Sequence, residues 1–178
     1  AWNLHPLMCE DVILRDVLVR NPWYAQNGDG VDIESCKNVL VEDCTFDVGD
    51  DGICIKSGRD KAGRDRAMPT ENVIIRRSVV YHAHGGFVIG SEMSGGARNI
   101  WVEDCSFIGT DIGLRFKTKR GRGGVVENIF IKNINMVGIP GEAILFDMYY
   151  EAVDPIPLLG DEKEPIKVVK LPVTEETP

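Results

Sequence analysis

The sequence predicts an all-β protein: a right-handed single-stranded parallel β-helix, about five coils of a longer solenoid. Three observations predict it. A segment of similar sequence recurs five times, apolar residues alternate within each copy, and a second short apolar strand accompanies each copy. A unit of about 30 residues built from short strands cannot bury its apolar face alone, whereas stacked units bury a continuous core. We place the coils in residues 1–150.

The recurring segment is expected to form the first strand of each coil. Its copies are CEDVILRDVLV from Cys9, CKNVLVEDCTF from Cys36, TENVIIRRSVV from Thr70, ARNIWVEDCSF from Ala97 and VENIFIKNINM from Val126. Apolar residues occupy alternate positions, a period of two that is typical of a strand with one buried face. The third position is Asp11 in the first copy and asparagine in the other four, so we expect an amide ladder at a turn.

The second strand of each coil carries the residues of chemical interest. Its apolar pairs are Val31/Ile33, Ile53/Ile55, Phe87/Ile89, Leu114/Phe116 and Ile144/Phe146. A glycine precedes four of them: Gly30, Gly52, Gly86 and Gly113. Aligning the coils on this glycine column gathers six polar residues into one narrow strip across four coils. They are Asp29, Asp50, Asp51, His84, Arg115 and Lys117.

The composition of this strip indicates acid–base chemistry on an anionic substrate. Stacked or adjacent carboxylates repel one another, so their pKa values must be pushed apart. Glycoside hydrolysis requires such a difference, since one carboxylic acid protonates the leaving oxygen and a carboxylate activates water. Arg115 and Lys117 are suited to binding a sugar carboxylate, the arginine through a bidentate contact.

Charge and cysteine content narrow the function classes. The net charge is −8, yet residues 56–66 and 115–122 are rich in lysine and arginine. Two basic segments in an acidic chain favour local recognition of an anion over nucleic-acid binding. No apolar run is long enough to cross a bilayer.

The five cysteines cannot all pair and include no C-x-x-C, so we expect buried free thiols, with Cys44 and Cys105 in the interior stack.

Four motifs in order resemble the polygalacturonases of glycoside hydrolase family 28. They are Asn27-Gly28-Asp29, Gly49-Asp50-Asp51, Ala83-His84-Gly85 and Arg115-Phe116-Lys117. The resemblance implies that Asp50 is the general acid and that Asp29 and Asp51 activate water. It implies that His84 supports the acid, that Arg115 and Lys117 bind a galacturonate carboxylate, and that Asn27 supports the site by hydrogen bonding.

The same resemblance implies hydrolysis of α-1,4-galacturonosyl bonds with inversion, without a metal or other cofactor. The expected partner is an anionic pectic polysaccharide or oligogalacturonide, with no nucleic acid and no membrane, and the expected location is secreted or periplasmic. The basic insertion at residues 58–69 is hypothesised to wall the groove and favour cutting at chain ends. Within and beside this insertion, Arg59 and Lys56 are further candidates for substrate binding. Residues 151–178 are expected to be a proline-rich, charged tail or a truncated long loop.

Two other functions remain open from the sequence. A pectate or rhamnogalacturonan lyase shares this fold, and the three aspartates are chemically able to bind calcium. A β-helix that only binds polysaccharide is the other alternative, and it leaves the ordered strip of Asp, His, Arg and Lys unexplained.

Overall fold

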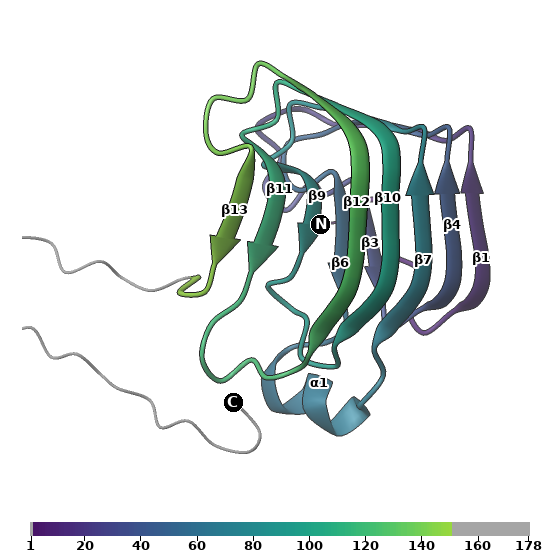
Figure 1. Ribbon diagram of the computed structural model, residues 1–178, viewed down its shortest axis with the longest axis vertical. Helices are drawn as coiled ribbons and strands as arrows, with labels where there is room; N and C mark the ends of the chain where they lie inside the picture. The colour runs from purple at the N-terminus through teal and green to yellow at the C-terminus, as the bar shows by residue number, and fades with distance from the viewer. Residues whose placement is uncertain (1, 151–178) are drawn as a thin grey trace, which may run out of the picture.

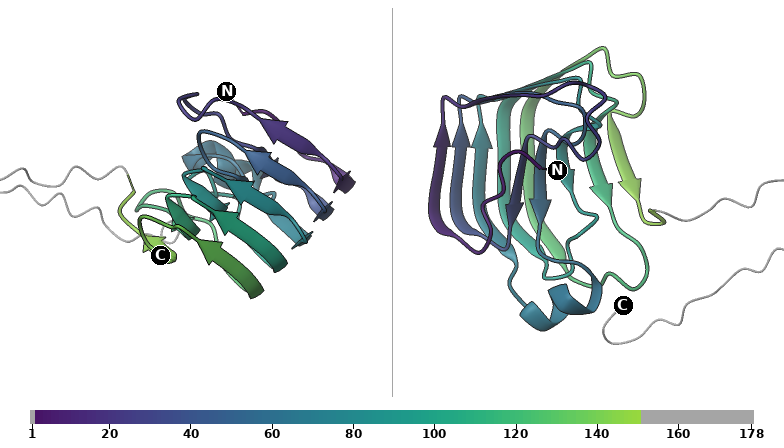
Figure 2. Two further views of the ribbon diagram at one scale, coloured as in Figure 1. Left: turned by 90° about the horizontal axis from the view of Figure 1, so that it is seen from above. Right: turned by 180° about the vertical axis from the view of Figure 1, so that it is seen from behind.

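The structure, a computed structural model that describes residues 2–150, is a parallel β-helix of five turns, as the sequence predicts (Figure 1). Five strands form the first sheet in the order β13-β11-β9-β6-β3. The second sheet runs β1-β4-β7-β10-β8-β5-β2, and β12 pairs with β10. Seen from above, the turns lie one behind another (Figure 2). The tail or loop expected for residues 151–178 lies outside the described residues.

The strands follow the predicted segments closely. The first sheet comprises β3 (Val31–Glu34), β6 (Ile53–Lys56), β9 (Gly85–Ile89), β11 (Ile112–Lys117) and β13 (Ile144–Asp147). The second comprises β1 (Glu10–Arg15), β2 (Leu18–Arg20), β4 (Lys37–Glu42), β5 (Thr45–Asp47), β7 (Thr70–Arg76), β8 (Val79–Tyr81), β10 (Ala97–Ile108) and β12 (Val126–Val137). In the last two full turns a single long strand replaces the two shorter ones.

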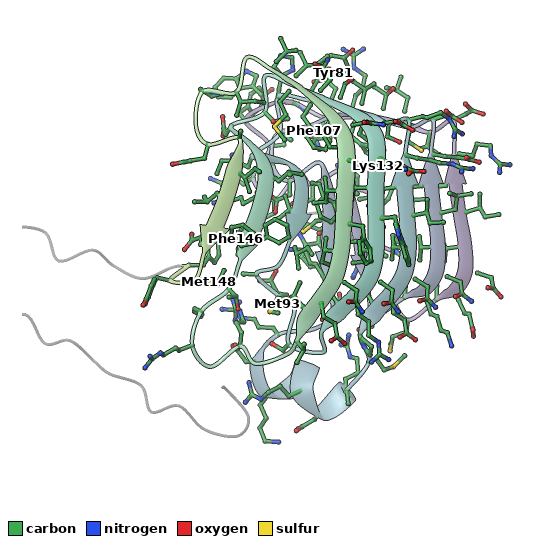
Figure 3. All side chains as sticks on the ribbon, in the orientation of Figure 1. Tyr81, Met93, Phe107, Lys132, Phe146 and Met148 are labelled. Atoms are coloured by element: carbon green, nitrogen blue, oxygen red, sulfur yellow. The ribbon has the colours of Figure 1, made fainter. Side chains whose placement is uncertain are left out.

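The core lies between the two sheets and consists of like residues stacked in columns. Val39 pairs with Val73, which pairs in turn with Ile100, and all three are buried. Phe107 lies on the inner side of β10, whereas Phe146 belongs to the edge strand β13 (Figure 3). At the β13 end the described residues leave a hollow of about 950 Å³, lined by core side chains such as Leu114 and Ile131. This hollow is the open end of the core; its lining includes Lys117 but none of the three aspartates of the strip.

The predicted amide ladder is present. Each asparagine donates a side-chain hydrogen bond to the residue 27, 34, 27 or 29 positions earlier: Asn38 to Asp11, Asn72 to Asn38, Asn99 to Asn72 and Asn128 to Asn99. All five residues have φ between 56° and 57°. Asparagine and aspartate tolerate this left-handed conformation better than other residues with a β-carbon, which explains why these two occupy the column.

The cysteines are free, as expected. Cys36, Cys44, Cys54 and Cys105 are buried, and Cys44 and Cys105 belong to the core. Cys9 is exposed, because it lies at the start of the first repeat, where no preceding turn of the described residues covers it.

The basic insertion contains a short helix that the sequence did not predict, α1 (Asp60–Arg66). Gly63 lies inside it, and glycine weakens helix propensity. A β-carbon at Gly63 would lie 2.6 Å from Gly58 C, so the close packing of this helix requires glycine there. Arg64 fixes the helix to a distant loop by donating to Gly121 O at 2.6 Å. In the described part of the chain, no helix has the length and apolarity needed to span a membrane.

Replacing Asn72 with alanine is expected to lower the free energy of unfolding by about 2 kcal/mol, measured by denaturant titration. The change removes ladder hydrogen bonds on both sides and leaves a β-carbon in the left-handed region. Asn72→Gly is the matched control, since it loses the same bonds without that strain and should be destabilised less. Equal destabilisation of the two variants would contradict this account of the ladder.

Candidate active site

The glycine column allows the turns to approach closely enough to assemble the predicted strip. A β-carbon on Gly52 would lie 2.4 Å from Val80 Cγ1, and one on Gly86 would lie 2.3 Å from Phe107 Cγ. Neither distance is possible for real atoms, so only glycine fits at these positions. Backbone hydrogen bonds from Gly30 N to Asp51 O (2.8 Å) and from Gly52 N to Gly85 O (2.9 Å) then align consecutive turns. The residue before each glycine is thereby stacked on its neighbour.

Asp50 and His84 form a pair at the exposed side of the strip. His84 Nδ1 lies 3.2 Å from Asp50 Oδ1, and His84 N donates to Asp50 O at 2.9 Å. Burial alone would raise the pKa of Asp50, but the hydrogen bond from His84 and its charge outweigh burial and lower that pKa. The bond to Asp50 in turn raises the pKa of His84. Both pKa shifts favour an ionised Asp50 beside a protonated His84.

Asp51, the residue after Asp50, is buried and forms an ion pair with a lysine two turns further along the β-helix. Lys117 Nζ donates to Asp51 Oδ2 at 2.6 Å, although 66 residues separate them in the sequence. Arg115 Nη1 lies 4.0 Å from Asp51 Oδ1. Burial would lower the pKa of Lys117, but the charge of Asp51 outweighs burial and raises it. Asp51 and Lys117 thus form a buried ion pair.

Asp29 is buried beside Asp51, and its pKa is shifted in the opposite direction from that of Asp50. Burial, followed by the charges of Asp51 and Asp50, raises the pKa of Asp29 to about 6. The pKa values of the carboxyls are therefore pushed apart, as expected. The simplest assignment would give the raised pKa to Asp50, the residue predicted to be the general acid. In the free protein it belongs to Asp29, because the imidazolium of His84 stabilises ionised Asp50.

The other three substrate-binding candidates differ in exposure and in their contacts. Lys56 is buried, with its Nζ 2.8 Å from Glu92 Oε2 and 3.5 Å from Asp32 Oδ1. Arg59 is exposed and lies 3.5 Å from Asp60 Oδ2. Asn27 is exposed in a left-handed turn conformation with φ 51°. The roles given to these residues in substrate binding stay predictions.

The structure adds Asn21 and Tyr150 to the site. Asn21 joins the two loops that carry the aspartates, since its Nδ2 donates to Gly28 O (2.8 Å) and its Oδ1 accepts from Gly49 N (2.9 Å). The Tyr150 ring lies 5.1 Å from Lys117 Nζ and 5.8 Å from Arg115 Cζ. Asn21 lies outside the repeat alignment and Tyr150 follows the last strand, so neither carried a sequence signal.

A third added residue, Asp32, is fully buried on β3 beside Asp29 and Lys56. It lies two residues after Gly30, in the register column that continues through Cys54 and Val88 to Arg115. The glycine alignment therefore carried a signal for Asp32 that the sequence analysis did not use.

One group of atoms in the strip has the spacing of a metal site. Ligand atoms of Asp29, Asp51 and Cys54 lie within 4.8 Å of one another. Burial raises the pKa of the Cys54 thiol well above its usual range, which disfavours the thiolate that binds metals. The Lys117 ammonium already balances Asp51 at 2.6 Å. The residues present therefore fit an arrangement neutralised by lysine better than a metal centre.

Known proteins are similar to this chain in both sequence and fold. The model of the glycosyl hydrolases family 28 matches residues 4–171. A probable polygalacturonase of Vitis vinifera is 36% identical over 137 residues, covering 76% of this chain and 28% of the relative. The crystal structure of a hyperthermoactive exopolygalacturonase from Thermotoga maritima is 41% identical, with a TM-score of 0.68, and the match covers 76% of this chain and 33% of that one.

A polygalacturonase from Erwinia carotovora ssp. carotovora is also similar, at 26% identity and a TM-score of 0.70. The match covers 82% of this chain and 38% of that structure, so the matches span between 28% and 38% of the length of these relatives. The matched family consists of hydrolases, which disfavours the lyase alternative. The chain belongs to the glycosyl hydrolases family 28.

Proposed function

We propose that the protein to which this chain belongs hydrolyses α-1,4-galacturonosyl bonds in polygalacturonate with inversion of configuration. The observation that carries the proposal is the strip itself. It combines a carboxyl–imidazole pair, two further carboxyls and two cations on neighbouring turns. Membership of family 28 and the similarity to polygalacturonases support this assignment.

The Asp50–His84 pair supplies the acid. The pair carries one proton and lies at the more exposed side of the strip, where His84 is about half exposed. A galacturonate carboxylate bound nearby adds negative charge, which raises the pKa of neighbouring carboxyls. The proton then moves from His84 to Asp50 and from Asp50 to the glycosidic oxygen. Protonation makes that oxygen a better leaving group as its bond to the sugar carbon breaks.

Asp29 and Asp51 supply the base. Asp51 is paired with Lys117 at 2.6 Å, and Asp29 is ionised above its pKa of about 6. These carboxylates orient a water molecule and accept its proton as the water oxygen bonds to the anomeric carbon. Attack from the face opposite the leaving group gives inversion, for which the acid and base carboxyls stand roughly 6.5–9.5 Å apart.

Arg115 and Lys117 supply affinity for the sugar carboxylate, with Tyr150 beside both cations. Hydrogen bonds to charged groups contribute about 1.5–3 kcal/mol each, enough to favour galacturonate over an uncharged sugar. The proposed partner is therefore an anionic pectic polymer or oligomer. Because such a polymer cannot pass a membrane unaided, we propose that the protein acts in a secreted or periplasmic setting.

Replacing Asp50 with asparagine is expected to lower kcat on polygalacturonate by roughly 10²–10⁴-fold, because the amide cannot deliver a proton. The measurement is release of reducing ends by the longer parent protein. Asp104→Asn is the matched control, since Asp104 accepts only a surface hydrogen bond from Asn133, and it should keep normal activity.

Two results would contradict the assignment to a hydrolase. Unaltered kcat in Asp50→Asn would remove Asp50 from the role of acid. Products with the ultraviolet absorbance of an unsaturated sugar, from any variant or from the unaltered protein, would instead establish a lyase.

The pH dependence of kcat/KM is expected to be bell-shaped. Activity rises with pH as Asp29 ionises, with a pKa of about 6 set by burial and by the neighbouring aspartates. It falls at higher pH as the Asp50–His84 pair loses its proton, with a midpoint above 6.5 because Asp50 raises the pKa of His84. A steady-state pH series measures both limbs, and an alkaline limb that is absent would exclude His84 from the acid pair.

The basic insertion is proposed to wall one end of the groove and favour release of terminal residues. Its helix α1 is joined to residues 121–122 through Arg64 Nη1–Gly121 O (2.6 Å) and Arg122 Nη1–Asp60 Oδ1 (2.7 Å). The products of a defined oligogalacturonate at early times test this proposal. Release of one short product together with a shortened oligomer is expected, and an early spread of intermediate lengths would refute it.

A further inference from the structure

The mechanism leaves one fully buried acid unused, Asp32 on β3. Its neighbours Val31 and Ile33 belong to the core, so its side chain points to the other face of the first sheet, the face that carries Arg115. Neither carboxyl oxygen accepts a hydrogen bond from a donor among the described residues. Its carboxyl lies within hydrogen-bonding range of the Asp29 carboxyl, and Lys56 Nζ lies 3.5 Å from Oδ1.

The nearby cations are engaged more closely elsewhere. Lys56 Nζ lies 2.8 Å from Glu92 Oε2, a shorter contact than its 3.5 Å to Asp32. Burial would raise the pKa of Glu92, but the charge of Lys56 and its hydrogen bond outweigh burial and lower that pKa to about 2. Lys117 Nζ is bound to Asp51 at 2.6 Å. Asp29 and Asp32 are thus two buried carboxyls in contact, and the cation that pairs with Asp32, Lys56, is shared with Glu92, to which it lies closer.

Two buried carboxyls in contact share a proton, because ionising both would place two negative charges side by side in a site that excludes water. We propose that Asp32 is a positioning residue whose carboxyl carries this proton and donates a hydrogen bond to the Asp29 carboxylate, orienting Asp29 and keeping it ionised as the base. The assignment of Asp29 as the base rests on the proposed function. The shared proton is a property of the chain itself.

The surroundings of Asp32 assign the proton to it rather than to Asp29. Burial raises the pKa of Asp32 to about 9, opposed by Lys56 and reinforced by Asp29 and Asp51. The pKa of Asp29 reaches only about 6, and the bond from Asp32 acts to lower it. The other ionisable group that faces this pair is Cys54, the register partner of Asp32, whose thiol stays protonated and donates to Gly90 O.

The first test is the pH dependence of thermal stability in this 178-residue chain. An acid whose pKa is raised by folding contributes stability at low pH, and this contribution is lost as pH rises towards about 9. Asp32→Asn abolishes that loss, so its Tm relative to the unaltered chain should rise by roughly 3 °C for each pH unit between pH 5 and 8.

Asp43→Asn is the matched control for this series. The hydrogen bond from Arg77 lowers the pKa of Asp43, so its stability difference should be flat over the same range. A flat difference for Asp32→Asn, or one that falls as pH rises, would mean that Asp32 is an ionised partner of Lys56 and would overturn the proposal.

Infrared spectroscopy in D₂O observes the proton directly. The carbonyl band of a protonated carboxylic acid should be present at pH 7.5 in the unaltered chain and in Asp43→Asn, and absent in Asp32→Asn. Persistence of the band in Asp32→Asn would also overturn the proposal. This result is independent of catalysis, so it stands even if the longer protein proves not to be a hydrolase.

In an active parent protein, two substitutions distinguish positioning from mere packing. Asp32→Asn keeps a donor for Asp29 and should leave the acid limb of the pH profile in place. Asp32→Leu has no donor and should move that limb to higher pH. If activity rose at the same pH in the two variants, Asp32 would have no part in setting the pKa of Asp29.

Discussion

The close approach of successive turns at the glycine column is the constraint on which the site depends. At Gly30, Gly52 and Gly86 the backbone of one sheet lies against side chains of the other at distances that exclude a β-carbon. Parallel backbone hydrogen bonds then fix the register of each turn against the next. Residues about 30 positions apart become neighbours. A substitution that separates two turns would therefore disrupt both the core and the chemistry.

The same stacking brings three carboxyls together in the strip, and the charge of each is balanced in a different way. Asp50 is balanced by the imidazolium of His84, and Asp51 by the ammonium of Lys117. Asp29 is left with no cation of its own and has a pKa of about 6. A site built from three neighbouring carboxyls therefore contains groups with distinct proton affinities. This difference is what general acid–base catalysis at a single pH requires.

The sequence predicted the features that follow directly from register. Once the repeats are aligned, the asparagine ladder and the strip from Asp29 to Lys117 are fixed, because in a parallel helix like positions are stacked. Features that depend on non-repeating contacts could not be predicted. The helix α1 contains Gly63 and depends on tertiary bonds such as that from Arg64 to Gly121. Lys56 shares a column with Lys117, yet Glu92 and Asp32 draw it into the interior.

The central claim is that stacking alone couples residues as distant in sequence as Asp51 and Lys117. A double-mutant cycle on the free energy of unfolding tests it most directly, with Asp51→Asn, Lys117→Met and the combined variant at neutral pH. Each single change should be strongly destabilising, since it leaves the other charge buried and alone. The combined variant should then be more stable than the sum predicts by about 1–3 kcal/mol. Additive losses would mean that the two side chains do not form the buried pair, and would contradict the account.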